Sequence, residues 1–215
     1  MTSISGPHLN HIQGEKAQGL VVILHGYGAS GDNLISLGEE WQADLPTLDF
    51  VAPNGIYPWE GGLLGGYQWF SLVDWNQKRI EQDMDRIRPQ LIHFLDQELA
   101  RRNLTYQDLV LVGFSQGAIL ALDVGLHGKG APAGIVAYSG GYISTKNIKH
   151  ADVPVLLIHG ADDAVLASES SLDAHTTFQT TGVNSQLHIL EDLEHSIDHR
   201  GVMLGAEFLK KNLIP

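Results

Sequence analysis

Five consecutive residues, Gly113-Phe114-Ser115-Gln116-Gly117, have the types and spacing needed to present a serine as a nucleophile. The apolar run before them is typical of a strand, and the run after them is typical of a helix. A strand that turns sharply on a serine and leaves as a helix exposes the hydroxyl group, but the turn needs small residues two positions away on each side. Gly113 and Gly117 meet that need. We therefore predict that Ser115 is a nucleophile; the alternative is a small-residue turn that carries no chemistry.

A serine hydroxyl group is a weak nucleophile until a base takes its proton and a carboxylate orients that base. Asp163 and His195 each stand just after an apolar run that predicts a strand. The chain order of serine, acid and histidine is that of the α/β-hydrolases. The sequence thus predicts a catalytic triad of Ser115, Asp163 and His195, with Asp162 as the close rival for the acid.

The choice of His195 needs weighing, because the chain has 11 histidines. His25 and His159 stand before glycines in predicted strand-end turns, where we expect them to brace the turn. The other histidines that we compared lie in strand or helix patterns: His188, His175 and His199. His195 is placed in a loop between the last predicted strand and the last predicted helix, which favours it as the base.

Acyl transfer also requires backbone N–H groups that can hold the negative charge of an oxyanion. One donor is expected from the residue after the nucleophile, Gln116, and the second from the loop after an early strand. The segment His25-Gly26-Tyr27-Gly28 is that loop, and its glycines let the backbone approach a substrate closely. Tyr27 is therefore the predicted second donor, unless the segment is only a glycine turn.

Two histidines at a four-residue spacing, His195 and His199, raise the question of a zinc site on a helix. The glutamate that normally follows the first histidine is missing, and no convincing third ligand accompanies the pair. The chain also has no cysteine, which excludes thiolate metal sites and disulfides. We therefore predict no metal site and no cofactor.

The composition is that of an ordinary globular protein. Its 215 residues, of which 43% are hydrophobic and 18% charged, are enough for a sizeable core, so we expect residues 1–215 to form a single domain. The net charge of −12 argues against nucleic acid or an anionic membrane surface as a partner. No signal peptide is visible, and no apolar run is long enough to span a bilayer. We expect a cytoplasmic protein without integral membrane association.

Strand and helix patterns alternate along the chain, which predicts an α/β protein with a mostly parallel central sheet and helices on both faces. The predicted strands are residues 20–24, 48–52, 109–112, 135–138, 153–158 and 186–190, with a short edge strand in 8–13. The predicted helices are 76–103, 116–127, 168–180 and 197–213, and Asp32 or Asn33 is expected to cap another. Pro89 is expected to kink or restart its helix, and Glu98 and Arg102 to form a minor surface pair.

Residues 53–75 differ from the rest of the chain, because they hold five glycines interleaved with aromatic residues. The segment is too rich in glycine for a helix and too long for a simple turn. Long ordered loops in compact domains are often functional, but the aromatic residues would also serve merely to pin the loop to the core. We treat residues 53–75 as a candidate substrate loop.

Several motifs together resemble the phospholipase/carboxylesterase family, which includes bacterial carboxylesterases and acyl-protein thioesterases. They are Leu24-His25-Gly26-Tyr27-Gly28, Ala52-Pro53-Asn54, Gln68-Trp69-Phe70, Gly113-Phe114-Ser115-Gln116-Gly117, His159-Gly160-Ala161-Asp162-Asp163 and His195-Ser196. The resemblance implies the α/β-hydrolase fold, Asp163 rather than Asp162 as the acid, and oxyanion donors at Tyr27 and Gln116. It also implies an acyl-binding groove near residues 53–75. The candidate substrate contacts are Leu63, Leu64, Trp69 and Val165.

Three positions depart from the pattern of that family. Members often carry leucine at the position of Tyr27, so we expect a shorter pocket beside the oxyanion site here. A proline is common just after the acid turn, where this chain has Val165-Leu166-Ala167. Glycine usually precedes the catalytic histidine, but here the residue is Glu194, whose carboxylate would favour protonated His195. These departures bear on substrate choice and pH optimum more than on the reaction type.

These observations favour a serine carboxylesterase that hydrolyses esters of small-to-medium acyl chains through an acyl-enzyme. One alternative is a lysophospholipase or an acyl-protein thioesterase, which needs a long apolar groove. Another is a non-catalytic binding protein of the same fold, which should lack a triad residue or a glycine of the oxyanion site. The expected partner is a small-molecule ester or acyl-thioester, and the chain is expected to act as a monomer or homodimer.

Overall fold

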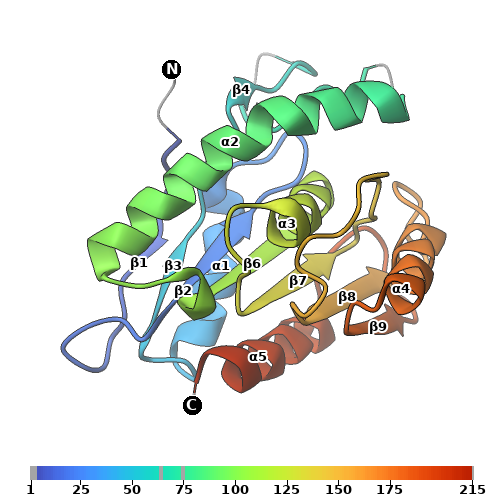
Figure 1. Cartoon of the computed structure of the whole chain (residues 1–215). Coiled ribbons are helices and arrows are strands. Elements are labelled where there is room, and N and C mark those ends of the chain that lie inside the picture. The colour runs from blue at the N-terminus through green and yellow to red at the C-terminus, as the bar shows by residue number, and fades with distance from the viewer. Residues whose placement is uncertain (1–3, 63–64, 74–75, 215) are drawn as a thin grey trace.

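A seven-stranded sheet runs through the molecule (Figure 1). The computed structural model describes residues 4–62, 65–73 and 76–214. The strands of the sheet are β1 (His8–Leu9), β2 (Gly19–Leu24), β3 (Leu48–Val51), β6 (Leu109–Phe114), β7 (Gly134–Tyr138), β8 (Val155–Gly160) and β9 (Ser185–Leu190). They lie in the order β1-β3-β2-β6-β7-β8-β9, and every neighbouring pair is parallel except β1 with β3.

Helices cover both faces of this sheet (Figure 1). Two of them, α1 (Gly31–Gln42) and α5 (His199–Leu213), lie on one face. The other face carries α2 (Gln77–Arg102), α3 (Gln116–His127) and α4 (Glu169–Thr181). The predicted fold class, a mostly parallel sheet with helices on both faces, is confirmed. Within the part of the chain that the structure describes, no helix has the length and apolar character needed to cross a membrane.

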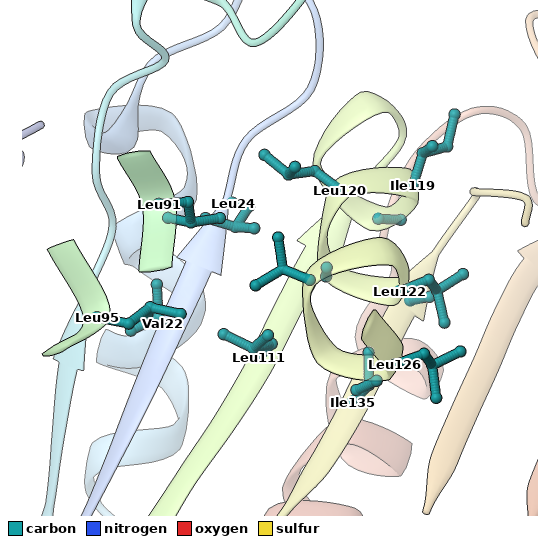
Figure 2. Packing of buried hydrophobic residues seen from close by; sticks show 14 of the residues in the cluster. Val22, Leu24, Leu91, Leu95, Leu111, Ile119, Leu120, Leu122, Leu126 and Ile135 are labelled. Carbon is teal, nitrogen blue, oxygen red and sulfur yellow. The ribbon is translucent and has the colours of Figure 1, made fainter. Parts of the chain in front are cut away.

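The central strands are mostly apolar, because helices exclude water from both of their faces. Every residue of β2, β3, β7 and β8 is buried. Figure 2 shows how Val22, Leu111 and Ile135 of the sheet share one cluster with Leu91 of α2 and Leu122 of α3. This packing holds β2 and β6 in place, so the loops that leave their carboxyl ends start from fixed points.

The helix α2 runs unbroken through Pro89, so the predicted restart at this residue is wrong. Proline removes one helical hydrogen bond, which costs about 3 kcal/mol in a helix interior. Tertiary contacts on both sides of Pro89 offset this loss. Arg88 donates two hydrogen bonds to Asp123 of α3, at 2.7 and 2.8 Å, while Ile87 and Leu91 are buried in the core.

The helix α1 begins one turn earlier than the predicted cap residues suggest. Its cap position is Ser30, so the prediction of a cap at Asp32 or Asn33 is wrong. Asn33 still contributes, because its side-chain oxygen accepts a hydrogen bond from the Ser30 N–H at 2.9 Å. This contact satisfies a backbone donor at the start of the helix.

A charged cluster joins the carboxyl end of α2 to the sheet. Arg102 donates to Asp49 Oδ2 at 2.6 Å and to Glu98 Oε2 at 2.7 Å, and its side chain is only 13% exposed. Asp49 also accepts from the backbone N–H of His11 at 2.7 Å. The prediction of a minor surface pair between Glu98 and Arg102 is therefore wrong. The pair is buried because β3 places Asp49 against it, which spacing along one helix does not reveal.

Replacing Arg102 is expected to destabilise the fold strongly. In the Arg102→Met variant two buried carboxylates lose the positive charge of Arg102, so the free energy of unfolding should fall by about 3 kcal/mol. Arg86→Met is the matched control, because Arg86 is 71% exposed in its pair with Asp83. Its loss should cost less than about 0.5 kcal/mol. Urea unfolding followed by circular dichroism measures both values, and equal losses would contradict the role given to the cluster.

Candidate active site

The loops that leave the carboxyl ends of the parallel strands share one edge of the sheet. Ser115 joins β6 to α3, Asp163 follows β8, and His195 follows β9. The sheet therefore brings the three predicted triad residues to the same edge. Ligands of open α/β sheets bind at this edge.

Ser115 lies in the sharp turn between β6 and α3 with φ 54° and ψ −116°, a backbone conformation that residues other than glycine rarely adopt. Its N–H donates to the Tyr138 carbonyl oxygen at 2.9 Å, and its own carbonyl oxygen accepts from the Ala118 N–H at 3.0 Å. A Cβ on Gly113 would lie 2.3 Å from the Gly117 carbonyl oxygen. The turn is thus closed by backbone contacts that leave no room for a larger residue.

The Asp163 carboxylate is fully buried and accepts hydrogen bonds at both oxygens. Oδ1 accepts the N–H groups of Val165 and Leu166, each at 2.9 Å, and Oδ2 lies 2.6 Å from His195 Nδ1. Burial by itself would raise the pKa of Asp163, but these two N–H groups and His195 outweigh it, so the pKa is lowered. Asp163 is therefore ionised at neutral pH and holds the His195 ring by Nδ1.

The acid turn presents Asp163, and not its rival Asp162, to His195. Asp162 is exposed, and its backbone N–H donates to the Leu193 carbonyl oxygen at 3.0 Å. A Cβ on Gly160 would lie 2.1 Å from the same oxygen. The acid turn and the loop that carries His195 are therefore in direct backbone contact.

His195 also lies against β6, the strand that leads to Ser115. Its ring packs on the Phe114 ring with 4.8 Å between the centroids, and Phe114 immediately precedes Ser115. The His195 side chain is 17% exposed. Because Asp163 holds Nδ1, Nε2 is the ring nitrogen that is placed to act as a base.

The sharp turn at Ser115, here named the elbow, is also reached by the loop that follows β2, the strand next to β6. A Cβ on Gly26 would lie 3.3 Å from Ser115 Cβ, so the backbone of this loop approaches Ser115 closely. Tyr27 follows Gly26 in the chain. Gln116 is the first residue of α3, where backbone N–H groups lack partners within the helix. The two predicted oxyanion donors, Tyr27 and Gln116, thus belong to segments that meet at Ser115.

The Gln116 side chain forms a clamp that the sequence did not reveal. It is buried, its amide oxygen accepts from the Trp69 backbone N–H, and its amide nitrogen donates to the Phe70 carbonyl oxygen, both at 2.8 Å. The Trp69 indole N–H donates to the His25 carbonyl oxygen at 3.0 Å. The segment around Trp69 is therefore fastened both to the elbow and to residues 25–28, called the oxyanion loop after their predicted role.

This clamp corrects the prediction that Trp69 is a substrate contact. The Trp69 side chain is 0% exposed, because its indole is held inward, so it supports the site from behind and offers a substrate no wall. Val165, two residues after Asp163, is 74% exposed, which leaves it available as a substrate contact. The predicted contacts Leu63 and Leu64 lie outside the described residues.

Residues 53–75 contain a short hairpin of β4 (Tyr57–Pro58) and β5 (Tyr67–Gln68), which pair antiparallel. Glu60 lies between the two strands, and its Oε1 accepts from Tyr27 Oη and from Ser71 Oγ, each at 2.8 Å. The hairpin is thereby tied to the oxyanion loop through the Tyr27 side chain. A single carboxylate in a glycine-rich segment gives no periodic signal, so the sequence does not reveal these contacts of Glu60.

His25 braces its turn as predicted and also joins it to the hairpin segment. His25 Nδ1 lies 2.7 Å from the Gly26 carbonyl oxygen, and Nε2 accepts from the Gly55 N–H at 2.8 Å. A carbonyl can only accept and an N–H only donate, so the ring is neutral with its proton on Nδ1. Burial lowers the pKa of His25 and outweighs the bond to Gly26, which raises it.

His195 and His199, the pair considered as zinc ligands, have different surroundings. His195 contacts Asp163, and His199 is the first residue of α5. Among the residues that the structure describes, no group of three or more histidine and acidic side chains is placed to hold a metal ion.

Comparison with known proteins agrees with this geometry. The sequence model of the phospholipase/carboxylesterase family matches residues 11–213. The chain belongs to this family. Its fold is that of an α/β-hydrolase, and the protein is a hydrolase that acts on ester bonds.

Individual relatives cover most of the chain. Esterase YpfH of Escherichia coli (strain K12) is 30% identical over 197 residues, which cover 90% of this chain and 83% of that protein. Acyl-protein thioesterase 1 of Eremothecium gossypii is 26% identical over 204 residues, which cover 89% and 87%. The crystal structure of esterase PE8 matches with a TM-score of 0.91 at 35% identity, covering 99% of this chain and 100% of that one.

The buried, neutral His25 predicts that stability falls as the pH drops below 6.5, the ordinary pKa of histidine. The folded protein lowers the pKa of His25, so the unfolded chain binds the proton at a higher pH than the folded chain does. As the pH falls from 6.5 toward this lowered pKa, the free energy of unfolding therefore decreases. His25→Gln keeps an acceptor for the Gly55 N–H but does not titrate. Urea midpoints measured at about pH 7.5 and pH 5.5 should therefore differ less in the variant than in the wild type.

The pH dependence should be reduced in the variant and not abolished. Burial also lowers the pKa of His127, which remains in both proteins. An equally steep loss of stability in His25→Gln and the wild type would contradict the role given to His25.

Proposed function

We propose that the protein is a serine carboxylesterase that hydrolyses carboxylic esters of small-to-medium acyl chains through an acyl-enzyme. The observation that carries the proposal is the 2.6 Å contact between Asp163 Oδ2 and His195 Nδ1, at the sheet edge that also bears the strained Ser115. A buried, ionised acid on one ring nitrogen prepares the other nitrogen to act as the base for a serine in the elbow.

In this mechanism Ser115 Oγ attacks the acyl carbonyl carbon while His195 Nε2 takes the hydroxyl proton. The backbone N–H groups of Tyr27 and Gln116 hold the oxyanion of the tetrahedral intermediate. The intermediate expels the alcohol, which receives the proton from His195, and the acyl group stays on Ser115. Water then attacks the acyl-enzyme with His195 again as base and then acid, and the carboxylic acid leaves. The mechanism needs no cofactor.

Contacts beside the oxyanion loop support a short acyl pocket. The Tyr27 ring meets the Trp59 ring edge-on with 6.1 Å between the centroids, and a Cβ on Gly28 would lie 3.0 Å from the Trp59 ring. The Trp59 side chain thus packs on Tyr27 and Gly28 of the loop that carries the proposed oxyanion donor. Hydrolysis of a lysophospholipid or a long-chain acyl thioester needs a long apolar groove, which this crowding disfavours. Similarity to acyl-protein thioesterase 1 supports thioester hydrolysis as the second candidate.

Ser115 is expected to be the nucleophile. A fluorophosphonate should form an adduct on Ser115 of the folded protein, detected by mass spectrometry, and Ser115→Ala should lower kcat/KM for p-nitrophenyl butyrate by at least about 10³-fold. Ser36→Ala is the control, because Ser36 is an exposed serine of α1. An adduct at another residue, or hydrolysis retained by Ser115→Ala, would contradict the mechanism. Absence of both labelling and hydrolysis in the wild type would favour a binding protein of this fold.

The acyl-chain preference is expected to depend on Tyr27. With p-nitrophenyl esters from acetate to palmitate, the highest kcat/KM should fall at acyl chains of about four to six carbons. Tyr27→Leu removes the ring and its bond to Glu60, so its optimum should move to longer chains. Tyr57→Leu, in the hairpin that contacts Tyr27 and 45% exposed, should leave the profile unchanged. A wild-type optimum at long chains would favour a lysophospholipase or an acyl-protein thioesterase.

A further inference from the structure

A second histidine, His159, touches the acid of the proposed triad and has no part in the mechanism above. It is the penultimate residue of β8, and its side chain is 0% exposed. His159 Nε2 lies 3.1 Å from Asp163 Oδ2, the same oxygen that contacts His195. The two histidines therefore share one carboxylate oxygen.

The partners of His159 Nε2 show where its proton lies. Besides Asp163 Oδ2, this nitrogen lies 2.8 Å from the Leu166 carbonyl oxygen. An ionised carboxylate and a carbonyl can only accept hydrogen bonds, so Nε2 carries a hydrogen and donates it toward both. This assignment holds whichever way the hydroxyl group at the other ring nitrogen points.

The contacts of Nε2 close a ring of hydrogen bonds around the acid turn. The Leu166 N–H donates to Asp163 Oδ1 at 2.9 Å, while the Leu166 carbonyl oxygen accepts from His159 Nε2. His159 Nε2 in turn donates to Asp163 Oδ2. A rotation of the carboxylate would break bonds at both of its oxygens. His159 therefore helps to determine the direction in which Oδ2 faces His195.

The other side of the His159 ring is anchored in the core. Nδ1 lies 2.7 Å from Ser171 Oγ, which lies 3.0 Å from the Gly140 carbonyl oxygen. Ser171 is fully buried in α4, and Gly140 follows β7. Both ring nitrogens are thus held by buried groups from separate elements, as a residue that orients a catalytic group requires.

We propose that His159 is a positioning residue for ester hydrolysis, which holds the Asp163 carboxylate in the orientation that His195 needs. This inference rests on the triad of the proposed function. A displacement of about 1 Å in a catalytic group can cost about 10²-fold in rate. Because His159 acts through Asp163 and does not touch the substrate, its loss should lower kcat and leave KM nearly unchanged.

Two substitutions of similar size separate the hydrogen bond from the packing. His159→Gln keeps an N–H donor, whereas His159→Met has the same length and no donor. For p-nitrophenyl butyrate, His159→Met should lower kcat by about tenfold with KM within about twofold, and His159→Gln should restore most of kcat. An equal loss of kcat in both variants would overturn the proposal, because packing alone would then explain the effect.

A double-mutant cycle tests whether the effect passes through the acid. In an Asp163→Asn background, His159→Met should lower kcat by less than about twofold, because no carboxylate remains to be positioned. A further loss as large as in the wild-type background would overturn the proposal.

His175→Met is the matched control. His175 also contacts a serine, with Nδ1 2.8 Å from Ser185 Oγ, and it lies on α4 as Ser171 does. Ser185 begins β9 at the edge opposite the site, so kcat should not change in this variant. A tenfold loss of kcat in this control as well would overturn the proposal, because any His-to-Met change beside α4 would then suffice.

A spectroscopic readout separates this inference from the proposed function. The proton in the short bond between His195 Nδ1 and Asp163 should give a strongly deshielded NMR resonance without turnover. It should shift in His159→Met and return in His159→Gln. If the wild type hydrolyses no ester while the resonance responds in this way, the proposed function fails and the positioning role stands. If hydrolysis is normal and neither the resonance nor kcat responds to His159→Met, the positioning role alone is overturned.

Discussion

Backbone contact at the turn between β6 and α3 is the constraint on which the site depends. A Cβ on Gly117 would lie 2.1 Å from the Leu24 carbonyl oxygen, so the end of β2 and the start of α3 meet with no side chain between them. This contact places the loop after β2 beside Ser115, whose positive φ costs roughly 1–3 kcal/mol. The strain persists because β2 and β6 are packed into the core on both faces.

Features that depend on sheet topology alone were predictable from the sequence. Parallel strands bring their carboxyl ends to one edge, so residues just after predicted strands are neighbours before any contact is known. That reasoning located Ser115, Asp163 and His195, and the structure joins Asp163 to His195 directly. The position of His25 before a glycine in a strand-end turn also predicts that it braces the turn. In the structure, backbone groups contact both of its ring nitrogens.

Features that depend on contacts between distant segments were not predictable. Periodicity along α2 identifies its apolar face, but it cannot show that Asp49 of β3 lies opposite Arg102. The family resemblance implies that Trp69 is a wall for a substrate, whereas the buried amide of Gln116 holds this segment from behind. A partner that is remote in the chain decides whether a side chain is a surface group, a support or a contact.

The Gln116 clamp holds the main-chain N–H of Trp69 and the main-chain carbonyl of Phe70, not their side chains. The main-chain atoms that Gln116 binds therefore do not depend on the side chains of the adjoining hairpin β4–β5. Glu60 differs, because its side chain in the hairpin accepts a hydrogen bond from Tyr27 of the loop after β2. Substitutions elsewhere in the hairpin can therefore change the surface next to the loop after β2, while the turn that carries Ser115 stays as it is.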